Sequence, residues 1–456
     1  MSSYKFFFKN LQNINQYEEL IKVFLQPSEY EITEDDSEAD RIFTFEGDKD
    51  ALKREIYGFL SSATGKRPKW GILTGIRPVK LAGELLDEYR DTDYLRQILS
   101  ERYLLHESKQ RLVTDILGYQ REKLGKPDRD SLSVYVGIPF CPTRCLYCSF
   151  TSNQVEEDEM ERYLAALLKE IEYCGRAAKV DGFHVESFYI GGGTPTSLSA
   201  EQLEVLLAAI ENHFDLSGAR EFTVEAGRPD TITAEKLTVL KEHRVSRISI
   251  NPQSMKEETL DLIGRRHDTD QVREAFRLAK ESGIGSINAD LIAGLPGEEL
   301  SDFERSLGEI INLGADNITL HTLAVKRASR LKEQDEHFNY RDEELRERML
   351  TFAREKLLAE GYLPYYLYRQ KHTSGNTENI GYCRKGHIST YNVRIMEEAQ
   401  SILAMGAGGI SKIYFLDENR LERVANVSNY EIYIERIDEM IERKNKGFFG
   451  VRDTGR

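Results

Sequence analysis

The stretch YVGIPFCPTRCLYCSF, residues 135–150, decides the fold of this chain. It places Cys141, Cys145 and Cys148 in a C-x3-C-x2-C array directly behind the apolar run 134–138. Such a run predicts a buried strand, and the proline that follows ends it because proline cannot donate to a strand ladder. We therefore expect the three thiols on a loop at the carboxyl end of a strand, where α/β folds place their chemistry.

Three thiolates are one fewer than the four that close a structural zinc or iron–sulfur site. An iron–sulfur cube held by three cysteines leaves one iron open to a small molecule. The alternative is a zinc loop that a distant histidine or cysteine completes. The specific spacing, together with the motifs that follow it in the chain, favours the iron–sulfur interpretation.

The chain is long and acidic. Its 456 residues are enough for two or three domains, and 62 Lys and Arg against 77 Asp and Glu give a net charge of −15. This charge disfavours a nucleic-acid partner but is compatible with a small anionic substrate in a local basic pocket. Cys174 and Cys383 are expected to be buried thiols rather than a disulfide. The absence of a signal-peptide pattern in residues 1–30 and of a membrane-spanning apolar run predicts a cytoplasmic protein without a membrane span.

From residue 131, apolar strands and amphipathic helices alternate along the chain. The six predicted strands lie at 133–138, 185–190, 221–226, 246–251, 286–292 and 317–323. These repeats predict an α/β fold, an incomplete, three-quarter TIM-like barrel with the helices outside a parallel sheet. We expect the barrel to occupy residues 126–335. A small α+β N-terminal domain of unknown role would span residues 1–125, and a C-terminal domain that covers the substrate would span residues 336–456.

Polar groups follow or interrupt several of the predicted strands. The second strand leads into GGGTPT, residues 191–196, where bare glycines allow a ligand to approach the backbone. Glu225 ends the third strand, where a carboxylate requires hydrogen-bond donors such as a ribose diol. An ion pair with Arg228 is the alternative. Asp290 lies inside the apolar fifth strand and suits an ammonium or hydroxyl partner.

The cysteine array, with Tyr147 before its last cysteine, resembles the signature of radical S-adenosylmethionine (SAM) enzymes. The longer string with Tyr135 and Ile-Pro-Phe before Cys141 is similar to that of the oxygen-independent coproporphyrinogen III oxidase (dehydrogenase) family, in particular its HemZ-type branch, which carries an extra amino-terminal domain. The resemblance extends to residues 70–86 and 364–412. It implies an open three-quarter barrel.

The resemblance also implies the cofactors. A 4Fe-4S cluster would be bound by Cys141, Cys145 and Cys148, and its electron would cleave SAM to release a 5′-deoxyadenosyl radical. One or two molecules of SAM are implied. The positions that match the family's cofactor-binding residues are Tyr135, Tyr147, Gly192, Gly193, Thr194, Glu225, Gln253, Arg265, Asp290 and Ala324. Arg266, next in the chain, is the alternative to Arg265.

The implied activity is that of an oxidoreductase of haem and porphyrin biosynthesis. Two propionates of coproporphyrinogen III would become vinyl groups, giving protoporphyrinogen IX, with a reductant such as flavodoxin or ferredoxin as partner. The four propionates of this tetrapyrrole call for cations, and Lys326, Arg327 and Arg369 are the candidates.

Two positions depart from the family pattern. The family's best-described members have a further cysteine where this chain has Phe150, and a histidine where it has Gly137. The cluster and SAM need neither group, whereas the substrate step could need both. Two alternatives therefore stay open: a haem-binding trafficking protein on the same scaffold, and a radical SAM enzyme that acts on another tetrapyrrole.

Overall fold

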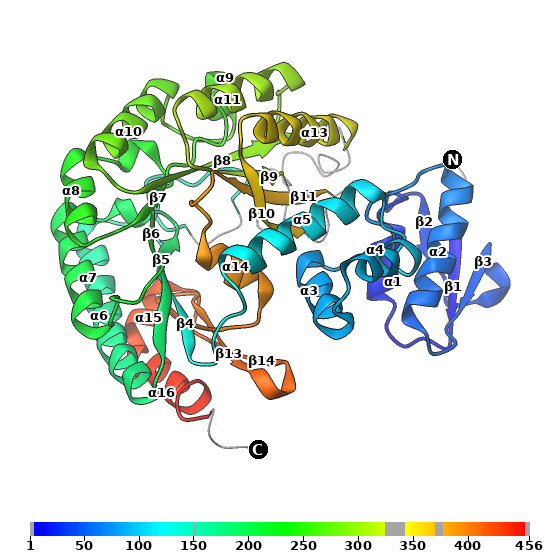
Figure 1. The fold of residues 1–456 in the computed structure, drawn as a ribbon, viewed down its shortest axis with the longest axis horizontal. Helices are drawn as coiled ribbons and strands as arrows, with labels where there is room; N and C mark the ends of the chain where they lie inside the picture. The colour runs from blue at the N-terminus through cyan, green and yellow to red at the C-terminus, as the bar shows by residue number, and fades with distance from the viewer. Residues whose placement is uncertain (1–3, 149–151, 324–342, 370–376, 452–456) are drawn as a thin grey trace.

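The computed structural model describes residues 4–148, 152–323, 343–369 and 377–451 (Figure 1). Its main feature is an eleven-stranded sheet in the order β10-β11-β9-β8-β7-β6-β5-β4-β12-β13-β14. The two edge strands, β10 and β14, do not pair with each other, so the sheet curves without closing. The predicted α/β fold with an incomplete barrel is confirmed.

The six predicted barrel strands are present and run parallel to one another. They are β4 (Ser131–Ile138), β5 (His184–Gly192), β6 (Glu221–Glu225), β7 (Arg247–Ser249), β8 (Ser286–Ala293) and β9 (Asn317–Thr322). Each apolar run lies buried in the sheet, as a parallel sheet covered by helices requires.

Helices connect these strands along the outer side of the sheet (Figure 1). They are α6 (Glu157–Val180), α7 (Ala200–His213), α8 (Ala234–Glu242), α9 (Glu257–Leu262), α10 (Thr269–Ser282) and α11 (Leu300–Asn312). Helices α7 and α10 begin at capping boxes, in which Ser199 and Asp268 satisfy backbone N–H groups of the first turn. The sequence therefore fixes where these two helices start.

Residues after the barrel add five strands to the same sheet. The C-terminal elements are α13 (Glu343–Ala359), β10 (Leu363–Arg369), β11 (Glu378–Cys383), α14 (Thr390–Glu397), β12 (Ser401–Met405), β13 (Ile410–Phe415), β14 (Arg420–Ala425), α15 (Tyr430–Glu435) and α16 (Ile437–Gly447). Strand β12 pairs in parallel with β4. From the sequence alone, we interpret residues 400–412 as a helix that runs into a glycine loop. This prediction is wrong, because the residues form β12 and the start of β13. A short apolar run does not distinguish a buried strand from a helix.

Helix α14 lies across the amino-terminal ends of the barrel strands. Glu221, at the start of β6, accepts hydrogen bonds from the Ser389 hydroxyl at 3.0 Å and from the Thr390 backbone N–H at 2.6 Å. Arg247, at the start of β7, donates to the carbonyl of His387 at 2.9 Å. The segment around α14 therefore closes this end of the barrel.

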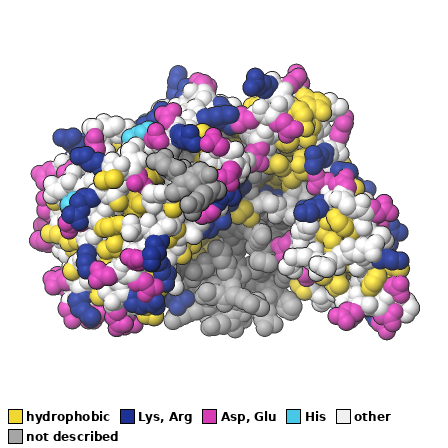
Figure 2. All heavy atoms as spheres, turned by 90° about the horizontal axis from the view of Figure 1, so that it is seen from below, with side chains coloured by type: hydrophobic (Ala, Val, Ile, Leu, Met, Phe, Trp, Pro, Cys, Tyr) yellow, Lys and Arg dark blue, Asp and Glu magenta, His cyan; other side chains and the backbone are white. Residues whose placement is uncertain are grey.

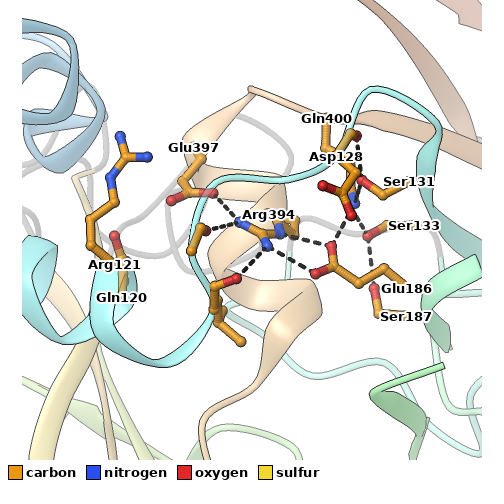
Figure 3. A network of polar contacts seen from close by, with 12 residues as sticks. Gln120, Arg121, Asp128, Ser131, Ser133, Glu186, Ser187, Arg394, Glu397 and Gln400 are labelled. Carbon is orange, nitrogen blue, oxygen red and sulfur yellow. Dashed lines mark hydrogen bonds and ion pairs between the residues drawn. The ribbon is translucent and has the colours of Figure 1, made fainter. Parts of the chain in front are cut away.

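A buried ion pair fixes α14 to β5 (Figure 3). The Arg394 guanidinium makes a bidentate contact with Glu186 at 2.8 and 2.9 Å and a further contact with Glu397 at 2.9 Å. The Gln400 amide also donates to Glu186, at 2.6 Å, and accepts from the Ser133 hydroxyl at 2.6 Å. Because the partners satisfy one another, this charged group is retained in the interior.

The first 125 residues form a separate three-stranded parallel sheet and five helices. These elements are β1 (Tyr4–Lys9), α1 (Asn15–Ile21), β2 (Tyr30–Ile32), β3 (Arg41–Thr44), α2 (Lys49–Thr64), α3 (Pro78–Tyr89), α4 (Thr92–Glu101) and α5 (Glu107–Lys123). Helices α3 and α5 pack against β10, between the small sheet and the barrel (Figure 1). The domain limit at 125/126 stays a prediction, and the limit at 335/336 lies outside the described residues.

Charges of both signs are interspersed over the face drawn in Figure 2. None of the helices in the described part of the chain is long and apolar enough to cross a bilayer. Cys174 and Cys383 are buried and free, as predicted.

Candidate functional site

The cysteine loop lies at the carboxyl end of β4, where the sequence predicts it. The backbone N–H of Cys141 donates to the carbonyl of Asn153 at 3.0 Å, and that of Cys148 to the carbonyl of Cys145 at 3.2 Å. The N–H of Leu146 donates to the carbonyl of Ile263 at 2.9 Å, which fastens the loop to the segment after α9. The loop is therefore held by the chain itself at three points.

The glycine-rich turn after β5 lies directly beside the cysteine loop. The backbone N–H of Gly193 donates to Ile138 at 2.7 Å, and the Thr194 hydroxyl lies 3.4 Å from the Cys141 sulfur. A Cβ atom on Gly193 would overlap the backbone of Phe140. Glycine is therefore required here because two chain segments pass close to each other.

Glu225 faces the interior of the barrel and accepts two hydrogen bonds. The Tyr189 hydroxyl donates to Oε1 at 2.5 Å and the Gly192 N–H donates to Oε2 at 3.3 Å. Burial raises the pKa of Glu225 to about 7; the Tyr189 hydrogen bond lowers it, and the charge of Asp290 raises it further. The alternative ion pair with Arg228 is not formed: that guanidinium contacts Asp230 at 3.0 Å instead.

Two buried arginines and a histidine stand behind the cysteine loop. Arg228 donates to the Thr143 hydroxyl at 2.7 Å. Arg265 donates to the carbonyl of Asn251 and interacts with Tyr147 and Cys145, whose influence raises its pKa although burial opposes this. Of the two adjacent arginines, Arg265 reaches the loop, since Arg266 is exposed.

His267 is buried beside these arginines. Burial, together with the charges of Arg265 and Arg228, lowers its pKa to about 3, so the ring is neutral. The site therefore holds fixed positive charge close to the thiols, as an anionic group bound there would require.

Gln253 and Asp290 come together at the neighbouring strands. Gln253 has a left-handed backbone, φ 70°, and its side-chain oxygen is buried without a hydrogen-bond partner among the described residues. Asp290 accepts from the Asn288 amide at 2.8 Å and lies 3.4 Å from the ring of His321. Tyr135 stacks against Tyr189, their ring centroids 6.2 Å apart.

Part of the predicted site is placed elsewhere or not described. Ala324, Lys326, Arg327 and Phe150 lie outside the described residues. Arg369 is buried against the ring of Trp70, 4.9 Å from the centroid, and donates to the carbonyl of Leu73. Its guanidinium therefore binds the N-terminal segment.

Sequence reasoning missed four interior side chains. Tyr189 orients Glu225, Tyr391 stacks on Tyr189 at 4.4 Å, and His321 lies between Asp290 and Tyr368. His321 lies in a stretch whose apolar and polar residues alternate, as is typical of a strand. The neighbouring sequence does not indicate that its partners are Asp290 and Tyr368.

The residues around the loop fit the implied cluster and SAM. Thiols are the ligands that iron–sulfur clusters take, and burial raises the pKa of Cys141 to about 11, so its thiolate requires a nearby cation. The unpartnered Gln253 oxygen and the Glu225 carboxylate offer acceptors to hydroxyl or ammonium donors. Among the described residues, no three His, Cys, Asp or Glu side chains are already gathered closely enough to hold a metal ion.

The Radical SAM superfamily matches residues 135–310. The oxygen-independent coproporphyrinogen-III oxidase-like protein HemZ of Bacillus subtilis (strain 168) is 40% identical over 405 residues, which are 87% of this chain and 80% of HemZ. The heme chaperone HemW of the same organism is 39% identical over 195 residues, 42% of this chain and 51% of HemW.

Among solved structures, coproporphyrinogen III oxidase (HemN) from Escherichia coli, a radical SAM enzyme, has a TM-score of 0.57 and 24% sequence identity. The match covers 71% of this chain and 73% of that one. At this identity the likeness concerns the fold alone.

Proposed function

Because this chain belongs to the radical SAM superfamily, among the HemZ-type oxygen-independent coproporphyrinogen-III oxidase-like proteins, we propose that it converts two propionates of coproporphyrinogen III to vinyl groups. The product would be protoporphyrinogen IX. Each propionate loses a hydrogen atom from its β-carbon, carbon dioxide and one electron, so turnover requires an electron acceptor. A 4Fe-4S cluster and SAM are the cofactors of this superfamily, and when bound they supply reductive cleavage of a sulfonium and a hydrogen-abstracting radical.

The observation that carries the proposal is the junction between the cysteine loop and Glu225. Gly192 donates its N–H to the Glu225 carboxylate, and Thr194, two residues later, contacts the Cys141 sulfur. The turn 192–194 thus joins the cysteine loop to Glu225, so the thiols would hold a cluster and the carboxylate would accept hydrogen bonds from the ribose of SAM at neighbouring positions. We propose that Cys141, Cys145 and Cys148 hold the cluster.

The chain's own residues would bind and orient the cofactor. Glu225 accepts from the ribose, Gln253 supplies its unpartnered oxygen, and Arg265 fixes the loop from behind. The stacked rings of Tyr135 and Tyr189 line the interior beside Glu225. We propose that the other predicted cofactor-binding residues, Tyr147, Gly192, Gly193, Thr194, Asp290 and Ala324, belong to the same site.

The propionates of the substrate need cations at the mouth of the barrel. We propose Lys326 and Arg327 for this role, since they follow β9 directly in the sequence. For Arg369 we propose a different role, holding the N-terminal segment, because its guanidinium is stacked on Trp70 and donates to backbone carbonyls there.

A second candidate function is that of a haem-binding trafficking protein. The similarity to heme chaperones favours it, although the alignment spans about half of the chaperone's length. Phe150, which replaces a cysteine of the oxidases, favours it as well. A radical SAM enzyme for another tetrapyrrole is the third candidate.

Anaerobic turnover of coproporphyrinogen III separates these candidates. Protein with reconstituted cluster, SAM, a flavodoxin-type reductant and an electron acceptor should yield protoporphyrinogen IX, and deuterium from the propionate β-carbons should appear in 5′-deoxyadenosine. Cys145→Ala should abolish both products, whereas the matched double variant Cys174→Ala/Cys383→Ala, whose thiols lie away from the loop, should retain them. Tight stoichiometric haem binding without deuterium transfer would contradict the proposed enzymatic function and support the haem-binding trafficking protein.

A further inference from the structure

Partly exposed side chains occur at matching positions inside the barrel. Each of these strands is buried except at such positions and at its ends. The partly exposed residues are Tyr135, Tyr189, Glu225, Asn288, Asp290, His321 and Tyr368. They contact one another across the strands, so they share the interior face. Their partial exposure distinguishes them from the fully buried residues that neighbour them on these strands.

His321 connects two sides of this interior. Its Nε2 lies 3.4 Å from the Asp290 carboxylate on β8, and its Nδ1 lies 3.1 Å from the Tyr368 hydroxyl on β10. Asp290 is held from its other oxygen by the Asn288 amide at 2.8 Å. The imidazole thus lies between the Asp290 carboxylate and the Tyr368 hydroxyl, and each ring nitrogen has one of them as its partner.

The contact between His321 and β10 crosses an intervening strand. β11 lies between β9 and β10 in the sheet, and its Gly381 stands opposite Tyr366. A Cβ atom on Gly381 would overlap the ring of Tyr366. Because Gly381 has no side chain, the tyrosines of β10 can lie over β11 toward His321. The contact between His321 and Tyr368 therefore depends on β9, β10 and β11 together.

Two like charges share this interior. The charge of Asp290 raises the pKa of Glu225, and His321 acts in the opposite direction. Two ionised carboxylates in a medium of low dielectric repel each other unless a cation compensates them. Within the part of the chain that the structure describes, the other titratable side chains that face this group are tyrosines: Tyr135 on β4, Tyr189 on β5, Tyr366 and Tyr368 on β10 and Tyr391 on α14.

We propose that His321 is a positioning residue of the cofactor site, whose imidazole, held between Asp290 and Tyr368, favours ionisation of Glu225 beside Asp290. The inference rests on the assignment of Glu225 and Asp290 to the cofactor site in the proposed function. His321 and Tyr368 lie outside the matched residues 135–310. The C-terminal strand β10 thereby sets the electrostatics of a site that the preceding strands build.

Binding of SAM as a function of pH tests the proposal. Affinity is measured by equilibrium dialysis between pH 6 and 9 on anaerobically reconstituted wild type, His321→Gln and Tyr368→Phe. In the wild type, affinity should fall as the pH drops through about 7, since Glu225 takes up a proton. In His321→Gln the midpoint should move up by about one pH unit, which weakens binding roughly ninefold at pH 6, roughly fivefold at pH 7 and very little at pH 9. Tyr368→Phe should shift it in the same direction by less.

The matched control is His243→Gln, which removes an imidazole paired with Glu204 and Glu211 on the outer helices. Its profile should coincide with that of the wild type. The amino group of SAM titrates equally for every variant, so its effect cancels in the ratio of affinities to the wild type.

Two results would overturn the inference: a His321→Gln profile that matches the wild type, or a loss of affinity that is equal at all pH values with iron content unchanged. The double variant Glu225→Gln/His321→Gln should show no upward shift relative to Glu225→Gln; a persisting shift would assign the titration to another group. Failure of the proposed function is a different outcome, in which the wild type binds SAM with this pH profile but converts no coproporphyrinogen III, or binds no SAM at all.

Discussion

Glu225 is a partly buried carboxyl whose environment opposes its charge. It accepts two hydrogen bonds, yet burial and Asp290 raise its pKa to about 7. The unfolded chain releases this proton near pH 4.5, so between pH 4.5 and 7 the folded state binds more protons. The contribution of Glu225 to the free energy of unfolding therefore falls as the pH rises through this window and stays low above pH 7.

Replacing Glu225 with glutamine should stabilise the iron-free protein at alkaline pH. We expect Glu225→Gln to raise the free energy of unfolding by about 1–2 kcal/mol at pH 8, because the neutral amide avoids the burial of charge but loses one hydrogen bond. At pH 5 the gain should vanish. Urea unfolding at both pH values measures this, with the exposed Glu235→Gln as control. A variant less stable than the wild type at pH 8 would contradict the prediction.

At the residue scale, the sequence identifies groups that local chemistry marks. Glu225 is predictable because a carboxylate at the end of an apolar strand needs donors, and the cysteines because their spacing is specific. His321 and Tyr368 are 47 residues apart and meet only because β11 brings β10 beside β9. No local sequence pattern predicts the contact between His321 and Tyr368.

At the element scale, α14 shows how a polar segment without clear periodicity becomes a structural part. It is held by the buried pair of Arg394 and Glu186 together with the buried side chains of Tyr391 and Val393. The barrel strands β4 to β9 are predictable because short stretches rich in apolar residues alternate with amphipathic helices along the chain. The strands after residue 400 are not, because β12 is a five-residue apolar run whose identity depends on β4 and β13 on either side.

Arg394 and Arg220 contact the same carboxylate and differ in burial. Arg394→Ala should lower the free energy of unfolding by about 3–5 kcal/mol, since it leaves Glu186 buried without its bidentate partner. The matched control Arg220→Ala removes a half-exposed guanidinium 3.6 Å from Glu186 and should cost less than about 1 kcal/mol. Thermal or urea unfolding compares the two, and equal losses would show that the pair does not hold α14.

At the scale of the whole molecule, a single indole joins the N-terminal part to the barrel. Trp70 donates its N–H to Glu378 at 2.8 Å, and its ring lies between the cations of Arg369 and Lys109. The backbone N–H of Arg369 also donates to the carbonyl of Ile76 at 2.8 Å. The segment 70–76 is therefore anchored at the carboxyl end of β10.

Removing the indole of Trp70 should weaken the attachment of segment 70–76 to β10. Trp70→Ala should raise amide hydrogen exchange in residues 70–77 and along β10, because a buried ring worth about 3–5 kcal/mol and a buried hydrogen bond are lost together. The core strands β5 to β8 should keep their protection. The control is Lys69→Ala, next in the chain, whose exposed ion pair with Glu347 contributes little. Faster exchange spread equally over the whole barrel would contradict a local anchor.

The parallel pairing of β12 with β4 also has a consequence for biosynthesis. Leu132 and Ser401 are paired in the sheet but lie about 270 residues apart in the chain. On a growing polypeptide, the strand that leads into the cysteine loop keeps one edge bare until the ribosome has passed residue 405. Contacts of such high contact order form late and slowly. We therefore expect iron–sulfur assembly factors to act on a chain that has been completed and released. We also expect truncations before β12 to leave the cysteine loop without a stably paired β4 beneath it.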